Sequence, residues 1–344
     1  MEKTMIEVFN NADEVQLRSF LAEKHDYEVG ANIAADAIMK VAADNPIHPV
    51  REYLDGREWD GKPRLARLLP DYFGAADNLY TRTLGRLMLT GAVSRIYEPG
   101  TAFHYVVILE GAQGSGKTRG IKILAIKPDW YAELTGDLAG KDAVDLIQGR
   151  LIVEVAELYS LTKSSIDITK SFISRESDKV RLPYQKRTES FARQCIFIGT
   201  TNQKKYLRDS TGNRRFLPVK VGKTNFEMLE ADRDQLWAEA TMIYKMGLAD
   251  LRLSPEVEKM AEAERSGREM FHAWREKIET WLADKDYDRI STAEIFADCL
   301  GFSEEQKTDA NCKQLTNIMS SLAWDGPKDI NFSGKTLKGY QKWG

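Results

Sequence analysis

Several residue types that define common classes of protein are scarce in this sequence or scattered through it. Only three of the 344 residues are cysteines, and no two of them have the C-x-x-C spacing of a redox or zinc motif: Cys195, Cys299 and Cys312. This usage is typical of a reducing cytoplasm and argues against structural zinc. The four histidines lie far apart in the sequence, which argues against a metal site built on imidazoles: His25, His48, His104 and His272.

Long apolar runs and an excess of one charge are also missing. No stretch is long and apolar enough to span a membrane, and residues 1–30 lack the basic start and apolar core of a secretory signal. We therefore expect a cytoplasmic protein that does not associate with a membrane. The formal net charge of −3 gives no overall nucleic-acid signature, so any contact with DNA must depend on local positive charge.

What is present is a pattern of helices that changes to alternating strands and helices. The breaker Asn45–Pro49 separates the first two helical regions, and from Thr101 the alternation predicts an α/β fold with a parallel sheet flanked by helices. We expect five regions: a helical lead-in (1–45), a helical subdomain (46–100), an α/β core (101–225), a helical region (226–285) and a C-terminal domain (286–344).

Periodicity also gives the individual elements. Helices are expected over Val50–Leu54, Arg64–Tyr72, Asn78–Ile96, Lys141–Ile147, Phe226–Met246, Pro255–Ala263, Met270–Ala283 and Asn311–Ala323. Buried strands are expected over Tyr105–Leu109, Arg150–Leu158 and Cys195–Asn202. Residues Trp130–Leu138 are interpreted as a loop that begins at a tryptophan, and Glu58–Leu65 as a packing corner anchored by Trp59, with DNA or nucleotide contact the minority alternative.

The most specific signal follows the strand Tyr105–Leu109. The next residues read G-x-x-x-x-G-K-[ST], and they are Gly111, Ala112, Gln113, Gly114, Ser115, Gly116, Lys117 and Thr118. A helix face made by Ile121, Leu124 and Ala125 comes after them. A strand, this glycine-rich segment and a helix are together the context that a phosphate-binding P-loop requires.

Each residue type of this segment suits a triphosphate. The glycines allow backbone N–H groups to turn inward around phosphates, and the helix N-terminus behind them adds partial positive charge. Lys117 is expected to reach the β- and γ-phosphates, and the Thr118 hydroxyl to ligate Mg²⁺. The alternative is a glycine-rich turn before an ordinary helix. Two other Gly-Lys-Thr triplets, at 222–224 and 334–336, lack the first glycine.

Polar residues at the ends of two other expected strands point to the same site. Glu154 and Glu157 lie where the second strand runs out, and ligands bind at that end of open α/β sheets. One carboxylate can hold Mg²⁺ through water and the other can orient the attacking water. Spacing does not decide between them, and we prefer Glu157 as the water activator and Glu154 on the metal side. The alternative is a pair of solvated surface glutamates.

Asn202 ends the third strand and is predicted to hydrogen-bond the γ-phosphate and the attacking water, unless it only caps the next turn. Arg214 and Arg215 follow on a loop and fit an arginine finger, delivered within the same chain or from a neighbouring subunit. The alternative is that one arginine simply bridges to Asp209.

Two further segments carry candidate DNA contacts. The densest basic stretch near the core could follow a phosphate backbone and stack a base, and its residues are Lys179, Arg181, Tyr184, Lys186 and Arg187. The alternative is a solvated, salt-bridged hairpin, because the acidic residues Asp167, Glu176 and Asp178 are interleaved with the basic ones. In the C-terminal region a capping box at Ser291–Glu294, a second helix and a hairpin around Ser333-Gly334 predict a winged helix-turn-helix. Its candidate DNA contacts are Lys313, Lys335, Lys338 and Lys342. The alternative for this domain is protein docking.

Several of these signals together resemble the virulence-associated protein E family, phage- and island-borne ATPases similar to superfamily 3 helicases. The resemblance rests on Trp59-Asp60-Gly61, Gly111–Thr118, Glu154 with Glu157, the segment from Lys170 through Asp178 to Tyr184, Gly199–Asn202 and Gly212–Phe216. It covers roughly Asn45 to Asn225 well and the C-terminal region more loosely.

The resemblance implies an AAA+-like ATPase core that forms a homo-oligomeric, hexameric ring and works on DNA in replication of a mobile element. It implies that Lys117 and Thr118 bind ATP and Mg²⁺, that Glu154 and Glu157 form the Walker B pair and that Asn202 is the sensor. Arg214 or Arg215 would be the finger across a subunit interface. The basic stretch would grip single-stranded DNA in the central pore, and the winged helix could bind duplex DNA. A separate primase partner is a further expectation.

Three functions are compatible with these features. The favoured one is an ATP-hydrolysing DNA motor, a replicative helicase similar to superfamily 3. The alternative is a DNA-binding switch that uses ATP for assembly and does not unwind. A small-molecule kinase would leave the winged module unexplained.

Overall fold

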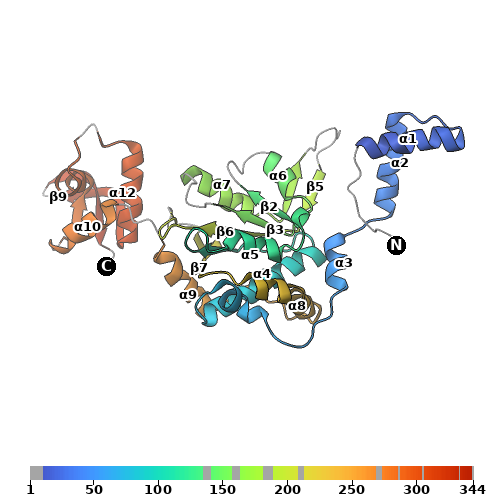
Figure 1. Ribbon diagram of the computed structural model, residues 1–344. Helices are drawn as coiled ribbons and strands as arrows, with labels where there is room; N and C mark the ends of the chain where they lie inside the picture. Colours follow the sequence, from blue (N-terminus) through green and yellow to red (C-terminus); the bar gives the residue numbers. More distant parts are fainter. Residues whose placement is uncertain are drawn as a thin grey trace. The chain divides into compact units, whose positions relative to one another are not determined.

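The computed structural model describes residues 11–134, 141–156, 163–180, 189–207, 213–268, 273–285, 287–303, 306–332 and 334–342. The chain divides into two compact units, residues 1–53 and residues 54–344. Figure 1 shows both units and labels many of their helices and strands. Each helix within the described ranges is too short or too polar to pass through a lipid bilayer.

The first unit is helical, as the sequence predicts. It contains α1 (Asn11–His25), α2 (Ala31–Asp44) and the beginning of α3 (Pro49–Asp55). Among the described side chains of α1 and α2 only that of Ala34 is buried, whereas Phe20, Val41 and other large apolar side chains are exposed. These two helices therefore enclose little apolar core of their own.

A five-stranded parallel sheet forms the centre of the second unit. Its strand order is β2-β3-β6-β1-β7, and every pair of neighbours is parallel. The strands are β1 (Val106–Glu110), β2 (Tyr131–Leu134), β3 (Ile152–Val155), β6 (Ile196–Thr201) and β7 (Phe216–Lys220). The prediction of a parallel sheet is confirmed, because the three expected strands are β1, β3 and β6.

The prediction of a loop over Trp130–Leu138 is wrong for residues 131–134, which form the edge strand β2. Ala132 and Leu134 are buried, whereas Tyr131 is half-buried and Glu133 is exposed. Four residues with two buried positions give too short an alternation to be recognised in a sequence. Pairing with β3, which is more than fifteen residues away along the chain, makes the strand.

Helices cover both faces of this sheet (Figure 1). One core cluster joins alternate residues of the strands to α6 (Lys141–Ile147) and α7 (Lys163–Ile173). The other face meets α4 (Leu79–Tyr97) and α5 (Lys117–Leu124), and the indole N–H of Trp237 in α8 (Phe226–Lys245) donates to the Leu124 carbonyl at 3.0 Å. The helix face predicted for α5 is confirmed, since Ile121, Leu124 and Ala125 are fully buried.

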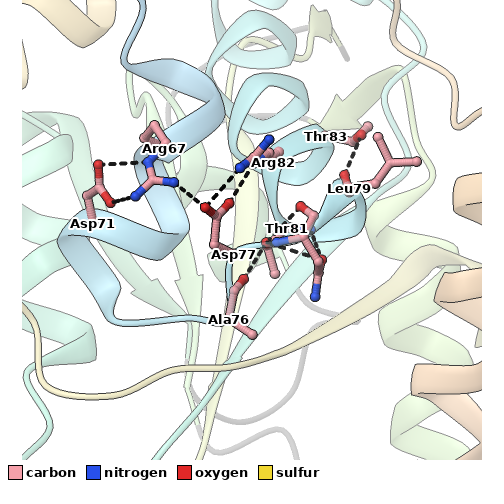
Figure 2. A network of polar contacts seen from close by, with 9 residues as sticks. Arg67, Asp71, Ala76, Asp77, Leu79, Thr81, Arg82 and Thr83 are labelled. Carbon is pink, nitrogen blue, oxygen red and sulfur yellow. Dashed lines mark hydrogen bonds and ion pairs between the residues drawn. The ribbon is translucent and has the colours of Figure 1, made fainter.

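The segment before α4 is helical, as expected, but its turns are irregular. Leu65–Arg67 forms the 3₁₀ turn η1, and Leu68–Tyr72 forms the π-helical turn η2. Figure 2 shows a polar network that extends from these two turns to α4. In it, Arg67 pairs with both Asp71 and Asp77. Asp77 also accepts two hydrogen bonds from Arg82, and a capping box at Asn78 begins α4. The network therefore ties η2 to the first turns of α4.

Residues 59–64 form a packing corner, as predicted. The Trp59 indole donates to the Lys62 carbonyl at 3.0 Å, and the Arg64 guanidinium donates to both oxygens of Asp60 at 2.8 Å. The Asp60 N–H donates to Gln235 of α8 at 2.8 Å. Gly61 has a φ of +82°, which a residue with a side chain rarely adopts.

The remaining elements of the core connect these parts. They are η3 (Pro128–Trp130), β4 (Ser177–Val180), β5 (Glu189–Ala192), η5 (Asn213–Arg215) and α9 (Pro255–Ser266). Strands β4 and β5 pair antiparallel as a separate two-stranded sheet. Two predicted helices are also confirmed in this part of the chain: residues 226–246 correspond to α8, and residues 255–263 lie within α9.

The last described segments form the C-terminal module, residues 273–342. Its antiparallel sheet has the order β8-β10-β9, and the capping box predicted at Ser291–Glu294 is confirmed. Ile278 lies in its core, and Trp274 and Trp281 pack against that core from the same helix. The elements are α10 (Ala273–Ala283), β8 (Arg289–Ser291), α11 (Thr292–Glu294), η6 (Ile295–Leu300), α12 (Asp309–Ser321), β9 (Trp324–Phe332) and β10 (Lys335–Lys342).

Candidate functional site

The glycine-rich segment 111–118 connects β1 to α5. Gly114 and Gly116 have φ values of +79° and +91°, and a side chain on Gly116 would meet the Phe226 ring at 2.4 Å. Both positions therefore require glycine. Gly116 is the N-cap of α5, and as a glycine it has no side chain with which to cap the first turn of that helix. The amides of this turn are available to an external acceptor, which makes the helix N-terminus suited to an anion.

A cavity of about 310 Å³ opens above this segment. Strands β1 and β6 are parallel and pair Glu110 with Thr201, so the residues after both strands leave the sheet at the same edge. The lining therefore combines the two connections: Gln113, Gly114, Gly116, Lys117, Thr118, Arg119, Thr200, Thr201 and Asn202. Asn202, predicted from its place at the strand end, lies with Lys117 and Thr118 at this cavity.

Lys117 is held against the glycine-rich segment that precedes it. Its ammonium donates to the carbonyl oxygens of Gly111 and Ala112 at 2.8 and 3.0 Å and to Ser115 Oγ at 3.2 Å. Burial lowers the pKa of this ammonium, and the charge of Glu154 opposes that shift. The lysine is thus a partly desolvated cation at the cavity, where an anion would be its strongest partner.

Glu154 is the buried carboxylate of the site. Its side chain is fully buried in β3, and it accepts hydrogen bonds from three hydroxyl groups. Thr118 Oγ1 and Thr200 Oγ1 donate to Oε1 at 2.8 and 2.6 Å, and the Tyr131 hydroxyl donates to Oε2 at 2.8 Å. These contacts join α5, β6 and β2 at one carboxylate. Glu157, the other glutamate predicted here, lies outside the described residues.

A second cluster beside the segment, which sequence reasoning missed, joins Glu110, Tyr206 and the partly buried Arg268. Arg268 Nε and Nη2 donate to the two Glu110 oxygens at 2.7 and 2.8 Å, and the Tyr206 hydroxyl donates to Glu110 at 2.7 Å. The Arg268 carbonyl accepts from the amides of Tyr206 and Leu207. Only tertiary contact brings together residues 158 positions apart, so spacing could not reveal this cluster. It fixes the end of β1, where the glycine-rich segment begins.

Arg214 and Arg215 lie at the opposite edge of the sheet from the cavity. They precede β7, which is parallel to β1 with Phe216 opposite Val106. The five residues of β1 separate the two edges by about 15 Å. Arg215 is half-buried and donates to Ser174 Oγ, whereas Arg214 is exposed. The structure therefore does not bring either arginine to the lining of the cavity of its own chain.

The basic stretch is described only in part. Arg181, Tyr184, Lys186 and Arg187 lie outside the described residues. Lys179 is exposed on β4, whereas its neighbour Asp178 is buried and pairs with the buried Arg193 through Nη2 at 2.6 and 2.7 Å. Arg193 also lies 4.6 Å from the centre of the Phe172 ring. The alternative of a solvated, salt-bridged hairpin is right about the ion pair of Asp178 and wrong about its solvation, because this aspartate is buried and anchors β4 in the core.

The lysines predicted in the C-terminal module lie on its surface. Lys313 is exposed on α12, and Lys335, Lys338 and Lys342 are exposed on β10. Lys338 pairs with Asp329 of β9 at 3.0 Å, which neutralises part of the positive charge of this hairpin.

Comparison with known proteins identifies the largest part of the chain. The model of the virulence-associated protein E-like domain matches residues 54–270, which is more than half of the sequence. No curated protein matches the chain.

Solved structures of the NrS-1 C terminal region in its apo form are similar to this chain. One is 16% identical, with a TM-score of 0.47, and the alignment covers 85% of this chain and 78% of that one. Another, the A form, is 14% identical with a TM-score of 0.49 and the same two coverages.

Proposed function

The chain belongs to the virulence-associated protein E-like family, and from this premise we propose that it is a Mg²⁺-dependent ATPase that acts on DNA. In this proposal it is a replicative helicase of a phage or mobile genetic element, similar to superfamily 3. Its core is an AAA+-like P-loop fold made by the five-stranded sheet, and its C-terminal module is a winged helix. One observation carries the proposal: Lys117, Thr118 and Asn202 line one cavity, and Thr118 is hydrogen-bonded to the buried Glu154.

The donor set of the cavity fits a triphosphate with Mg²⁺. Magnesium prefers hard oxygen ligands and usually takes one or two protein oxygens together with phosphate and water. Thr118 Oγ1 and Glu154 supply a hydroxyl and a carboxylate that are already in contact at 2.8 Å. The uncapped first turn of α5 supplies amides, and Lys117 supplies a cation. When bound, Mg²⁺ would neutralise charge that develops on the phosphate oxygens.

Each residue of the proposed ATP site then has a defined task. The amides of the glycine-rich segment and Lys117 hold the phosphates, and Thr118 with Glu154 holds the metal side. Asn202 donates from its side-chain amide to the terminal phosphate or orients water beside it. We assign activation of that water to Glu157, which follows the strand that carries Glu154. Arg214 or Arg215 would approach the terminal phosphate from a neighbouring copy, because neither reaches the cavity of its own chain.

The proposed DNA contacts use residues outside this cavity. Lys179 and the basic residues after it would follow a single strand in the pore of a homo-oligomeric, hexameric ring. Lys313 and the lysines of β10 would bind duplex DNA at the winged helix. A separate primase would act as a partner. The alternative function, an ATP-dependent assembly switch without unwinding, shares the ATP site and differs only in its effect on DNA.

Steady-state ATP hydrolysis with and without single-stranded DNA tests the proposal. We expect single-stranded DNA to raise ATP turnover. We expect Lys117→Ala to reduce it by about 100-fold or more, because the ammonium that stabilises the negative charge of the transition state is removed. Lys127→Ala is the matched control, since Lys127 follows α5 and lies over the Trp130 ring at 4.9 Å, away from the cavity lining. A wild-type protein that hydrolyses no ATP would refute the ATPase. Hydrolysis and ATP-driven assembly without strand separation would favour the switch.

A further inference from the structure

Tyr131 is a residue of the site to which the P-loop motif assigns no task. Its hydroxyl donates to Glu154 Oε2 at 2.8 Å, and its side chain comes from the edge strand β2. The register of β2 and β3 places Glu133 opposite Glu154. Tyr131 stands two residues before Glu133, so it is the diagonal neighbour of Glu154 on the same face, at a separation that a long aromatic side chain spans. The sheet itself therefore directs this contact.

The acceptor capacity of Glu154 shows what the contact achieves. An ionised carboxylate has about four lone-pair positions. Thr118 and Thr200 take the two on Oε1, and Tyr131 takes one of the two on Oε2. One position on Oε2 remains for a metal ion or a metal-bound water. A glutamate has one more rotatable bond than an aspartate, so the orientation of this last position depends on a donor that fixes Oε2.

Tyr131 is itself fixed by its surroundings. Lys122 of α5 lies over its ring, with Nζ at 5.1 Å from the ring centre. The preceding residue, Trp130, is 6% exposed and belongs to the core. The Tyr131 hydroxyl is a phenol, which keeps its proton at neutral pH and therefore remains a donor to Glu154.

We propose that Tyr131 is a positioning residue whose hydroxyl holds Glu154 in the orientation that binds Mg²⁺ at the glycine-rich segment. The inference rests on the proposed ATPase function and deepens it. Tyr131 acts through Glu154 and contacts no substrate. Groups that orient the ligands of a metal commonly change its affinity when they are removed, without altering the ligands themselves.

The test is the Mg²⁺ dependence of Tyr131→Phe, measured by titrating Mg²⁺ into protein mixed with a non-hydrolysable ATP analogue. We expect the Mg²⁺ concentration at half-saturation to rise by about tenfold. Binding of the analogue without Mg²⁺ and the melting temperature should stay at the wild-type values. Tyr244→Phe is the matched control, because the Tyr244 hydroxyl also donates to a carboxylate, Glu98 Oε1 at 2.7 Å, on the exposed surface.

A double variant shows whether the effect passes through the carboxylate. In a Glu154→Gln background, Tyr131→Phe should weaken Mg²⁺ binding no further, because the group that it positions is already neutral. An additive loss, or a Tyr131→Phe protein that matches Tyr244→Phe, would overturn the inference and leave the ATPase proposal intact. A lowered melting temperature together with lost analogue binding would make Tyr131 merely structural. Absence of Mg²⁺-dependent analogue binding in the wild type would refute the proposed function itself.

Discussion

The two edges of the five-stranded sheet differ in how their charged side chains are satisfied. At the carboxyl edge, Lys117 and Glu154 find their partners within one chain, around one cavity. At the amino edge, Arg95 is fully buried and donates to the carbonyls of Thr101, Phe103 and Cys195. Arg214 is exposed there, and among the described residues its guanidinium makes no ion pair or hydrogen bond.

This difference indicates what each edge can do alone. The carboxyl edge already holds a cation, a hydroxyl, a carboxylate and an amide in one place. The amino edge holds arginines of two kinds: buried ones that stabilise the fold, and Arg214, which is exposed and has no charged partner among the described residues. Asp209, the partner suggested by the sequence, lies outside those residues. Burial and the neighbouring charge of Arg214 lower the pKa of Arg215. An anionic partner from a second copy would relieve this repulsion.

The largest expected effect comes from separating the two edges onto different chains. Arg214→Ala should reduce ATP turnover by about 10³-fold, as removal of an arginine finger does. Lys117→Ala should also be inactive, because it loses the cation that holds the phosphates. In an equal mixture of the two inactive variants, about one quarter of the interfaces would pair an intact Lys117 with an intact Arg214. We therefore expect the mixture to regain a substantial part of wild-type turnover in a steady-state assay.

Arg215→Ala, mixed with Lys117→Ala in the same way, tests the other candidate finger, whose guanidinium also donates to Ser174 within its own chain. A mixture that stays inactive would show that the arginines do not act across an interface. A variant of Arg214 that unfolds would place this residue among the structural arginines and remove the contrast between the two kinds.

A smaller effect, on stability, distinguishes the buried arginines. Asp178→Asn leaves the buried Arg193 without a charged partner, and we expect the free energy of unfolding to fall by about 3–5 kcal/mol. Urea denaturation followed by circular dichroism measures this change. Asp329→Asn removes the partner of Lys338 in an exposed pair and should change stability by less than the method resolves. Equal effects of the two substitutions would contradict a structural role for the buried pair.

The smallest expected effect is a pH dependence at the carboxyl edge. Burial lowers the pKa of Lys117 from its ordinary 10.5, so as the pH rises the ammonium loses its proton earlier than an exposed lysine would. ATP affinity should fall by about fivefold as the pH rises through that lowered pKa, since a charged hydrogen bond is replaced by a neutral one. The same shift, taken alone, destabilises the folded protein at lower pH, and this penalty is relieved as the pH rises through the window, because the unfolded chain holds the proton longer.

Equilibrium binding of an ATP analogue between pH 7 and 10.5 measures the change in affinity. Lys117→Arg provides the comparison, since a guanidinium keeps its charge throughout this range. A fall in affinity of equal size in Lys117→Arg would assign the pH dependence to another group.

Local patterns in the sequence predicted the parts of this protein that local chemistry controls. Backbone conformation explains the glycines at 114 and 116 and the capping box at Ser291. Hydrophobic spacing predicted the buried strands of the sheet. The place of Asn202 at the cavity follows from the general rule that parallel strands end at one edge. Such features depend on residues close together in the chain, and for that reason a single sequence was enough.

Only the tertiary structure decided which of the polar residues meet. Tyr131 contacts Glu154 because β2 pairs with β3, although its segment was expected to be a loop. Asp178 is a core residue because Arg193, which follows β5, pairs with it. Arg214 lies at the edge of the sheet opposite the cavity because β7 runs parallel to β1. Strand pairing and the burial of charge are set by residues far apart in the sequence, and spacing along the chain does not contain them.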